Sequence, residues 1–240
     1  MKYENAGDVL PAHLLEEIKK YAAGKLLYVP LEKERKAWGE LSGYRHMLVK
    51  RNQLIVNMFL HGVEVEQLSA KFHLSEETIK KIVYSRKNKF QLTYSPTLKS
   101  ASEYSEAGLL EEWIHTYLLF HRRNEIFSDG LRLCYRYYIG PIMMPLSLFQ
   151  RSSGPEYDMK WKVHPEVFEH RVSEWLNKIV QTEDTPPLLI NYEHNKFEIN
   201  SDNPLYEALV RSRVAEYPVI IWITAKECHD AFLNTYGMYV

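Results

Sequence analysis

The spacing of the hydrophobic residues changes along this chain, and the change limits the folds that the chain can adopt. Over residues 1–90, apolar side chains recur with a helical period, as they do on the buried face of an amphipathic helix. Further on, two short apolar runs, Leu188–Tyr192 and Val219–Thr224, each follow a proline, a pattern typical of buried strands. The sequence therefore predicts an α+β protein of two domains, in which a mostly helical domain precedes a small α/β domain.

The first domain, residues 1–90, has the order of elements of a helix-turn-helix protein. Two short helices joined by a tight turn follow a longer supporting helix, and Ser75 is a favoured N-cap residue for the second short helix. In order, the expected elements are a helix at 11–22, a short strand at 26–29, a helix from Trp38 to His61-Gly62, a helix at 65–72 and a helix from Ser75 to about 87.

A stretch rich in serine and threonine, residues 91–106, is predicted to be a linker to the second domain, residues 107–240. Helical and strand patterns alternate in the second domain, so we expect a small mixed sheet accompanied by helices. Its predicted elements are helices at 107–120, 163–180 and 204–213, a turn at Asp129-Gly130, and strands at 131–138, 188–192, 197–199 and 219–224.

Charge is distributed unevenly between the two parts of the chain. Residues 1–93 carry 16 Lys and Arg against 11 Asp and Glu, a net charge of +5, whereas residues 94–240 carry 14 against 20, a net charge of −6. Such an asymmetry indicates a nucleic acid partner for the basic part alone.

Composition favours a soluble protein of the cytoplasm. Two cysteines are too few for a disulfide framework, which favours a reducing compartment. We expect no signal peptide, because no apolar stretch follows the N-terminal residues. We also expect no membrane helix, because no run approaches the ~20 apolar residues that such a helix needs.

Several separated segments of the first domain resemble the Mor-type transcription activators and their bacterial relatives. The segments are Asp8-Val9-Leu10-Pro11, Gly24–Pro30, Gly39–Arg45 and the helix region Leu74–Tyr84, and the resemblance covers residues 5–88. The resemblance implies a homodimer that pairs through residues 8–30 and presents two helix-turn-helix units to double-stranded DNA.

The residue types on the second short helix agree with a DNA-binding role. The start of this helix lies nearest the base edges in helix-turn-helix complexes, where lysine can donate to guanine and glutamate can accept from cytosine. The residues predicted at the DNA interface are Ser75, Glu77, Thr78, Lys80 and Lys81 near the bases, and Arg86, Lys87, Lys89, Arg45, Lys50 and Arg51 at the phosphates. An alternative stays open: a lysine pair is often a solvated face, acidic residues repel phosphate, and similar helices occur in protein-interaction domains.

Four segments of the second domain resemble the ParB/sulfiredoxin-like fold, and the resemblance covers residues 107–227. The segments are 187–192, 196–200, 206–209 and the strand at 219–224. Active members carry glycine, histidine and arginine between the second strand and the next helix, where these residues hold a nucleotide phosphate. Here the corresponding residues are Asp202, Pro204 and Leu205. The resemblance therefore implies a fold that is kept without its nucleotide chemistry, in a protein that is not an enzyme and uses no cofactor.

What remains at this position is a degenerate ligand pocket, predicted to consist of Asn200, Asp202, Asn203 and Glu207. Either Asp202 or Asn203 is suited to cap the helix that follows. An altered active pocket built from the same four residues is the alternative.

The remaining histidines and cysteines give no pattern of a metal or catalytic site. His115 and His121, like His164 and His170, are six residues apart and point to different helix faces, whereas a zinc-binding pair on a helix is four apart. Cys134 falls in a predicted strand, where we expect it to be buried.

The sequence thus favours a dimeric DNA-binding transcription regulator whose second domain is a regulatory or partner-binding module. A protein-binding effector or inhibitor that acts through the second domain, in a phage or mobile-element setting, is the first alternative. A nucleotide- or DNA-processing enzyme is the second alternative.

Overall fold

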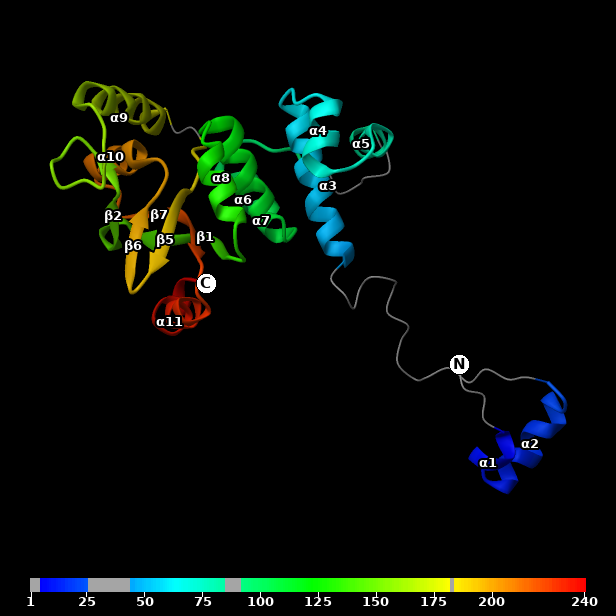
Figure 1. Ribbon diagram of the computed structural model, residues 1–240. Coiled ribbons are helices and arrows are strands. Elements are labelled where there is room, and N and C mark those ends of the chain that lie inside the picture. Colours follow the sequence, from blue (N-terminus) through cyan, green and yellow to red (C-terminus); the bar gives the residue numbers. More distant parts are fainter. Residues whose placement is uncertain (1–4, 26–43, 85–91, 182–183) are drawn as a thin grey trace. The chain divides into compact units, whose positions relative to one another are not determined.

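The computed structural model describes residues 5–25, 44–84, 92–181 and 184–240 (Figure 1). The chain divides into two compact units, residues 1–45 and residues 46–240. Helices and strands are both present, so the fold is α+β, as predicted. Among the helices of the described residues, none is long and apolar enough to cross a membrane.

The first unit contains α1 (Ala6–Val9) and α2 (Ala12–Ala22), and α2 matches the helix predicted at 11–22. Pro11 precedes α2 at its N-cap position, where the fixed φ of proline suits a helix start. No side chain of α2 is buried: Leu14 is 41% exposed and Tyr21 is 84% exposed. The strand predicted at 26–29 lies outside the described residues, as does the rest of the proposed dimer segment beyond Lys25.

Three helices follow where the sequence predicts a helix-turn-helix: α3 (Tyr44–Leu60), α4 (Val65–Phe72) and α5 (Glu76–Val83). Ile55, Leu68 and Ile79, one from each helix, are fully buried in a shared core. His73 ends α4 in the left-handed conformation, and the Ser75 hydroxyl caps α5 by accepting a hydrogen bond from the Thr78 amide, as predicted for Ser75.

A five-stranded mixed sheet forms the centre of the second unit, with the strand order β1-β7-β5-β6-β2. The strands are β1 (Tyr137–Pro145), β2 (Phe149–Arg151), β5 (Leu188–Glu193), β6 (Lys196–Ile199) and β7 (Glu216–Ile223). The central pair, β5 and β7, is parallel, and β1 pairs with β7 in antiparallel fashion. A separate small sheet joins β3 (Ser153–Gly154) to β4 (Trp161–Lys162).

Helices cover both faces of this sheet. On β5, Leu188 and Ile190 belong to one hydrophobic cluster and Leu189 belongs to another on the opposite face. The first cluster includes residues of α9 (Pro165–Val180), α10 (Asn203–Arg211) and α11 (Lys226–Tyr236). The second includes residues of α6 (Leu98–Glu106), α7 (Leu110–Thr116), the π-helical turn η1 (Tyr117–His121) and α8 (Glu125–Arg132). Burial on both faces explains why the two central strands are continuous apolar runs, as predicted.

The interpretation of residues 91–106 as a linker is corrected by α6, which occupies Leu98–Glu106. Thr97 caps this helix by accepting a hydrogen bond from the Ser100 amide, and Ala101 and Tyr104 are fully buried. The serines and threonines that suggest a linker are therefore helix caps and small packing residues. In consequence, α4 and α5 share one compact unit, residues 46–240, with the sheet, and the predicted boundary at residue 90 falls inside this unit.

The turn predicted at Asp129-Gly130 and the strand predicted at 131–138 are also corrected. Asn124 caps α8, which continues through Asp129-Gly130 to Arg132, and Leu131 points into the core from this helix. Strand β1 begins at Tyr137 instead. Cys134 lies between the two elements and is exposed rather than buried.

Candidate functional site

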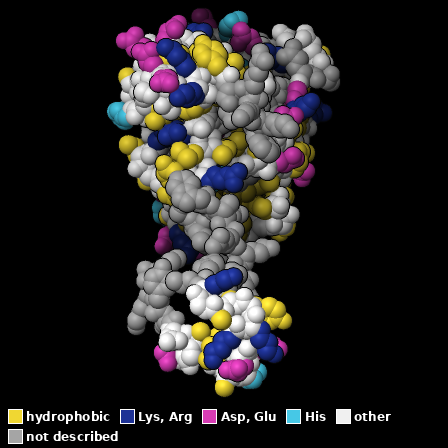
Figure 2. All heavy atoms as spheres, turned by 90° about the vertical axis from the view of Figure 1, so that its right-hand side faces the viewer, with side chains coloured by type: hydrophobic (Ala, Val, Ile, Leu, Met, Phe, Trp, Pro, Cys, Tyr) yellow, Lys and Arg dark blue, Asp and Glu magenta, His cyan; other side chains and the backbone are white. Residues whose placement is uncertain are grey.

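The solvent-facing side of α5 carries the side chains predicted to contact DNA bases. Lys80 Nζ lies 3.1 Å from Glu76 Oε2, and Lys81 Nζ lies 2.9 Å from Glu77 Oε1. All four side chains are more than half exposed, so these pairs are solvated and weak. Figure 2 shows Lys and Arg side chains interspersed with Asp and Glu on the side of the molecule that carries α5, rather than a uniform basic patch.

The residues predicted to contact phosphates are placed differently from one another. Arg45 is exposed near the start of α3, and Arg51 donates hydrogen bonds to the Asn52 side chain. Lys50 is not available for a phosphate contact, because its Nζ lies 3.0 Å from Glu111 Oε2 of α7 in a half-buried ion pair. Arg86, Lys87 and Lys89 lie outside the described residues.

A buried polar network joins α3 to α6 and α7. The Asn57 amide donates to the Thr116 hydroxyl at 2.8 Å, and its Oδ1 accepts from the Tyr104 hydroxyl at 2.9 Å and from Gln53 Nε2 at 2.9 Å. Gln53 also donates to the Leu92 carbonyl oxygen at 2.9 Å. Buried amides and hydroxyls hold their partners in fixed geometry, so the network ties the supporting helix to the C-terminal part of the unit.

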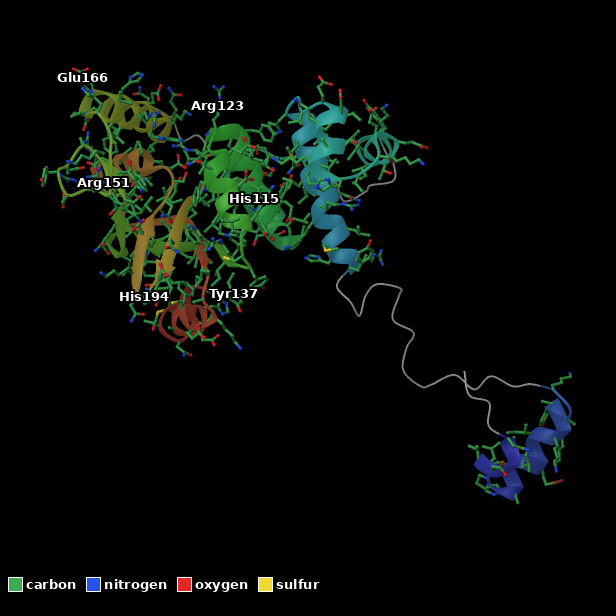
Figure 3. All side chains as sticks on the ribbon, in the orientation of Figure 1. His115, Arg123, Tyr137, Arg151, Glu166 and His194 are labelled. Atoms are coloured by element: carbon green, nitrogen blue, oxygen red, sulfur yellow. The ribbon has the colours of Figure 1, made fainter. Side chains whose placement is uncertain are left out.

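Titratable side chains of α7 also lie at the contact between α3 and α7. Glu112 is 6% exposed, and burial raises its pKa to about 7. Its neighbour Glu111 faces His115 and Lys50, which lower the pKa of Glu111 to about 2. His115, labelled in Figure 3, is buried, and burial lowers its pKa.

A second site lies where β6 leads into α10, at Asp202. Asp202 is 2% exposed and holds the N-cap position of α10 in the left-handed conformation, but its carboxylate does not cap the helix. Arg122 Nη1 lies 2.7 Å from Asp202 Oδ1, and Tyr117 and Ser201 donate their hydroxyls to Asp202 Oδ2. Burial and the neighbouring carboxylate raise the pKa of Tyr117 far above its ordinary value, so this hydroxyl stays a donor.

The Asp202 carboxylate is thus neutralised by an arginine from another part of the chain. Tyr117 lies in η1 and Arg122 directly follows it, and both precede Asp202 by 80 residues or more. The sequence did not reveal this contact, because no spacing rule links residues on separate elements at such a distance. The only signal was the basic Arg122-Arg123 pair that follows the predicted helix at 107–120.

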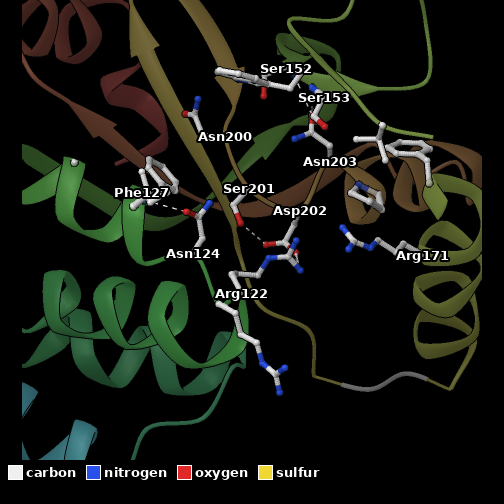
Figure 4. Close-up of a pocket in the computed structure, with 17 residues that line it drawn as sticks. Arg122, Asn124, Phe127, Ser152, Ser153, Arg171, Asn200, Ser201, Asp202 and Asn203 are labelled. Atoms are coloured by element: carbon white, nitrogen blue, oxygen red, sulfur yellow. Dashed lines mark hydrogen bonds and ion pairs between the residues drawn. The ribbon is translucent and has the colours of Figure 1, made fainter. Parts of the chain in front are cut away.

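A cavity of about 670 Å³ opens beside Asp202 (Figure 4). Three of the four residues predicted for the degenerate pocket line it: Asn200, Asp202 and Asn203. Asn203 is held in place, since its Oδ1 accepts hydrogen bonds from the Ser152 and Ser153 amides. Glu207 does not line the cavity but pairs with Arg211 at 2.9 Å.

The cavity wall contains more positive than negative charge. Arg122, Arg123 and Arg171 line it, and Asp202 is the acidic residue beside them. Figure 4 shows Arg122, Arg171 and Asp202 approaching the cavity from three different elements. Over the described ranges, no group of three or more His, Cys, Asp and Glu side chains is placed to hold a metal ion.

Comparison with known proteins gives a relative for part of the chain. No family model matches the chain, and no solved structure matches it. The chain is 46% identical over 87 residues to a Bacillus subtilis (strain 168) protein named Uncharacterized protein YraL. The match spans 36% of this chain and the whole length of YraL. Over this segment the chain belongs to the same family as YraL.

Proposed function

We propose that this protein is a sequence-specific DNA-binding transcription regulator that reads double-stranded DNA with α5. The observation that carries the proposal is the arrangement of α5 within the three-helix unit. Ile79 and Ile82 are buried against α3 and α4, while Glu77, Lys80 and Lys81 are exposed on the opposite side. In a helix-turn-helix protein, this exposed side of the second helix is the one that enters the major groove.

The ion pairs on α5 are compatible with this role. A solvated pair between lysine and glutamate contributes little to stability, about 0.3–0.5 kcal/mol for residues four apart on a helix. Lys80 and Lys81 can therefore exchange Glu76 and Glu77 for a guanine edge or a phosphate at small cost. Glu77, once released from Lys81, can accept a hydrogen bond from cytosine.

The proposed regulator acts as a homodimer through its N-terminal segment. The apolar side chains Leu14, Leu15 and Ile18 share one side of α2, and none of them is buried within the described chain. A second copy of this chain would cover that face. In such a dimer the C-terminal domain serves as a regulatory or partner-binding module and takes no part in catalysis.

The proposal is tested by titrating the full chain onto a labelled duplex of its own upstream DNA and onto a scrambled duplex, with fluorescence anisotropy as the readout. We expect preference for the upstream DNA, two chains per duplex, and an affinity that falls steeply with salt as counterions are released. The double variant Lys80→Glu, Lys81→Glu should lose the preference and lower the salt slope by about 2.

A matched control is Lys162→Glu with Lys226→Glu, which changes the net charge equally at exposed positions of the C-terminal part. The variant Lys80→Gln, Lys81→Gln removes the positive charges without creating repulsion against Glu76 and Glu77, so it tests the contact even if the reversal unfolds α5. Equal binding to both duplexes, or equal affinity of the α5 variants and the control, would overturn the proposal and move attention to the C-terminal domain as a protein-binding effector.

A further inference from the structure

We infer that the cavity beside Asp202 binds a small organic anion, in which a phosphate or carboxylate group is attached to an apolar or aromatic body. The inference is independent of DNA binding, because the cavity and its arginines lie in the C-terminal part of the chain. It rests on the charge, the shape and the lining of the cavity.

The charge of the cavity wall selects for an anion. The lining residues include three arginines and one aspartate, which leaves a net charge of +2. Arg171 has no hydrogen bond or ion pair with any residue that the structure describes, so no described carboxylate neutralises it. A guanidinium group of this kind prefers a carboxylate or phosphate, to which it can donate two parallel hydrogen bonds.

Arg122 can hold the ligand and Asp202 at the same time. Its contact with Asp202 is made through Nη1, at 2.7 Å, and arginine carries five N–H donors in a planar fork. The Tyr117 and Ser201 hydroxyls satisfy the other carboxylate oxygen of Asp202. Because Asp202 is paired in this way, its charge does not repel an anion as a free carboxylate would.

The remaining wall suits the body of the ligand. Phe127, Trp161 and Phe168 line the same cavity, and its volume of about 670 Å³ falls within the range usual for small-molecule sites. The Asn200 side-chain oxygen is buried beside it without a hydrogen-bond partner in the described chain, so a hydroxyl or amide of the ligand has an acceptor available. The combination indicates a ligand with one anionic end and one apolar end.

Isothermal titration calorimetry of the full chain with phenyl phosphate tests the inference, with inorganic phosphate as the probe of the anionic group alone and benzyl alcohol as the neutral analogue. We expect phenyl phosphate to bind once per chain, inorganic phosphate to bind more weakly, and benzyl alcohol not to bind. Arg171→Ala should weaken the binding of phenyl phosphate by about tenfold or more, because it removes a charge-assisted contact.

Arg171→Lys keeps the charge but loses the planar fork, so its affinity should lie between those of Arg171→Ala and the unchanged chain. Arg213→Ala removes an exposed arginine that does not line the cavity, and its affinity should equal that of the unchanged chain. Arg171 is itself exposed, so its replacement leaves the fold intact, which circular dichroism checks. The inference is wrong if phenyl phosphate does not bind at millimolar concentration, or if Arg171→Ala and Arg213→Ala bind it equally well.

Discussion

At the scale of single residues, the pairing of buried charges is the feature of the structure that the sequence does not predict. The sequence alone presents Asp202 as an unpaired carboxylate in the predicted degenerate pocket. The structure pairs it with Arg122 and Tyr117, so its charge is balanced within the protein. Three of the four residues that the resemblance implied for the pocket line the cavity. The arginines could not be predicted, because they come from distant elements.

Glu112 gives a prediction about pH. Burial raises its folded-state pKa to about 7 from an ordinary value of 4.5, so the folded state binds a proton that the unfolded state releases between these two values. The stability from this group is full below pH 4.5 and is lost as the pH rises to about 7, at a cost of about 3 kcal/mol. Glu112→Gln stays neutral, so we expect it to be more stable than the unchanged chain above pH 7 and equal to it near pH 4.5.

Urea unfolding of both proteins over this pH range measures the difference. Glu106→Gln, at an exposed position on α6, is the matched control and should follow the unchanged chain at every pH. A difference between Glu112→Gln and the unchanged chain that does not vary with pH would show that the Glu112 carboxylate does not titrate in this window.

At the scale of elements, the contact of α3 with α6 and α7 attaches the three-helix unit α3–α5 to the rest of the compact unit. Tyr104 lies at its centre, because its hydroxyl donates to Asn57 Oδ1 and lies 3.1 Å from both Gln53 Nε2 and the Leu92 carbonyl oxygen. A buried amide that loses its hydrogen-bond partner destabilises the folded state, because the cost of removing that amide from water is no longer offset. The element predicted to be a linker is thus part of the support for the proposed DNA-binding helices.

Tyr104→Phe removes the hydroxyl from this network and leaves the ring in place. We expect the free energy of unfolding, measured with urea, to fall by about 1–3 kcal/mol, since Asn57 and Gln53 remain buried with one partner fewer. Tyr135→Phe, at a tyrosine that is 75% exposed, should change it by less than about 0.5 kcal/mol. Equal values for the two variants would mean that the network does not stabilise the contact.

The elements that the sequence predicts well are those whose period or caps are unambiguous. The predicted helices at 65–72 and 163–180 and both central strands agree with α4, α9, β5 and β7 to within three residues. Predictions fail where the local composition suggests a loop or turn but the side chains pack as part of a helix. The serines of α6 resemble a linker, and Asp129-Gly130 resembles a turn although a helix capped by Asn124 continues through it.

At the scale of the whole molecule, one helical segment contacts both candidate sites. On α7, Glu111 and Thr116 bind side chains of α3, and immediately afterwards Tyr117 and Arg122 bind Asp202. The proposed DNA-reading unit and the proposed anion site are therefore built against the same segment, residues 110–122. The division into domains at residue 90, which composition suggests, does not follow this packing.

Hydrogen–deuterium exchange of the full chain, with and without its own upstream DNA, tests the central claim most directly, because it locates the DNA on the protein. Helix α5 is short, and one of its sides faces solvent, so exchange of its amides reports a bound partner. The account predicts that DNA slows exchange in α5 and in the turn that precedes it, and leaves exchange in α11 unchanged. Slower exchange confined to residues 105–240, with α5 unaffected, would contradict it.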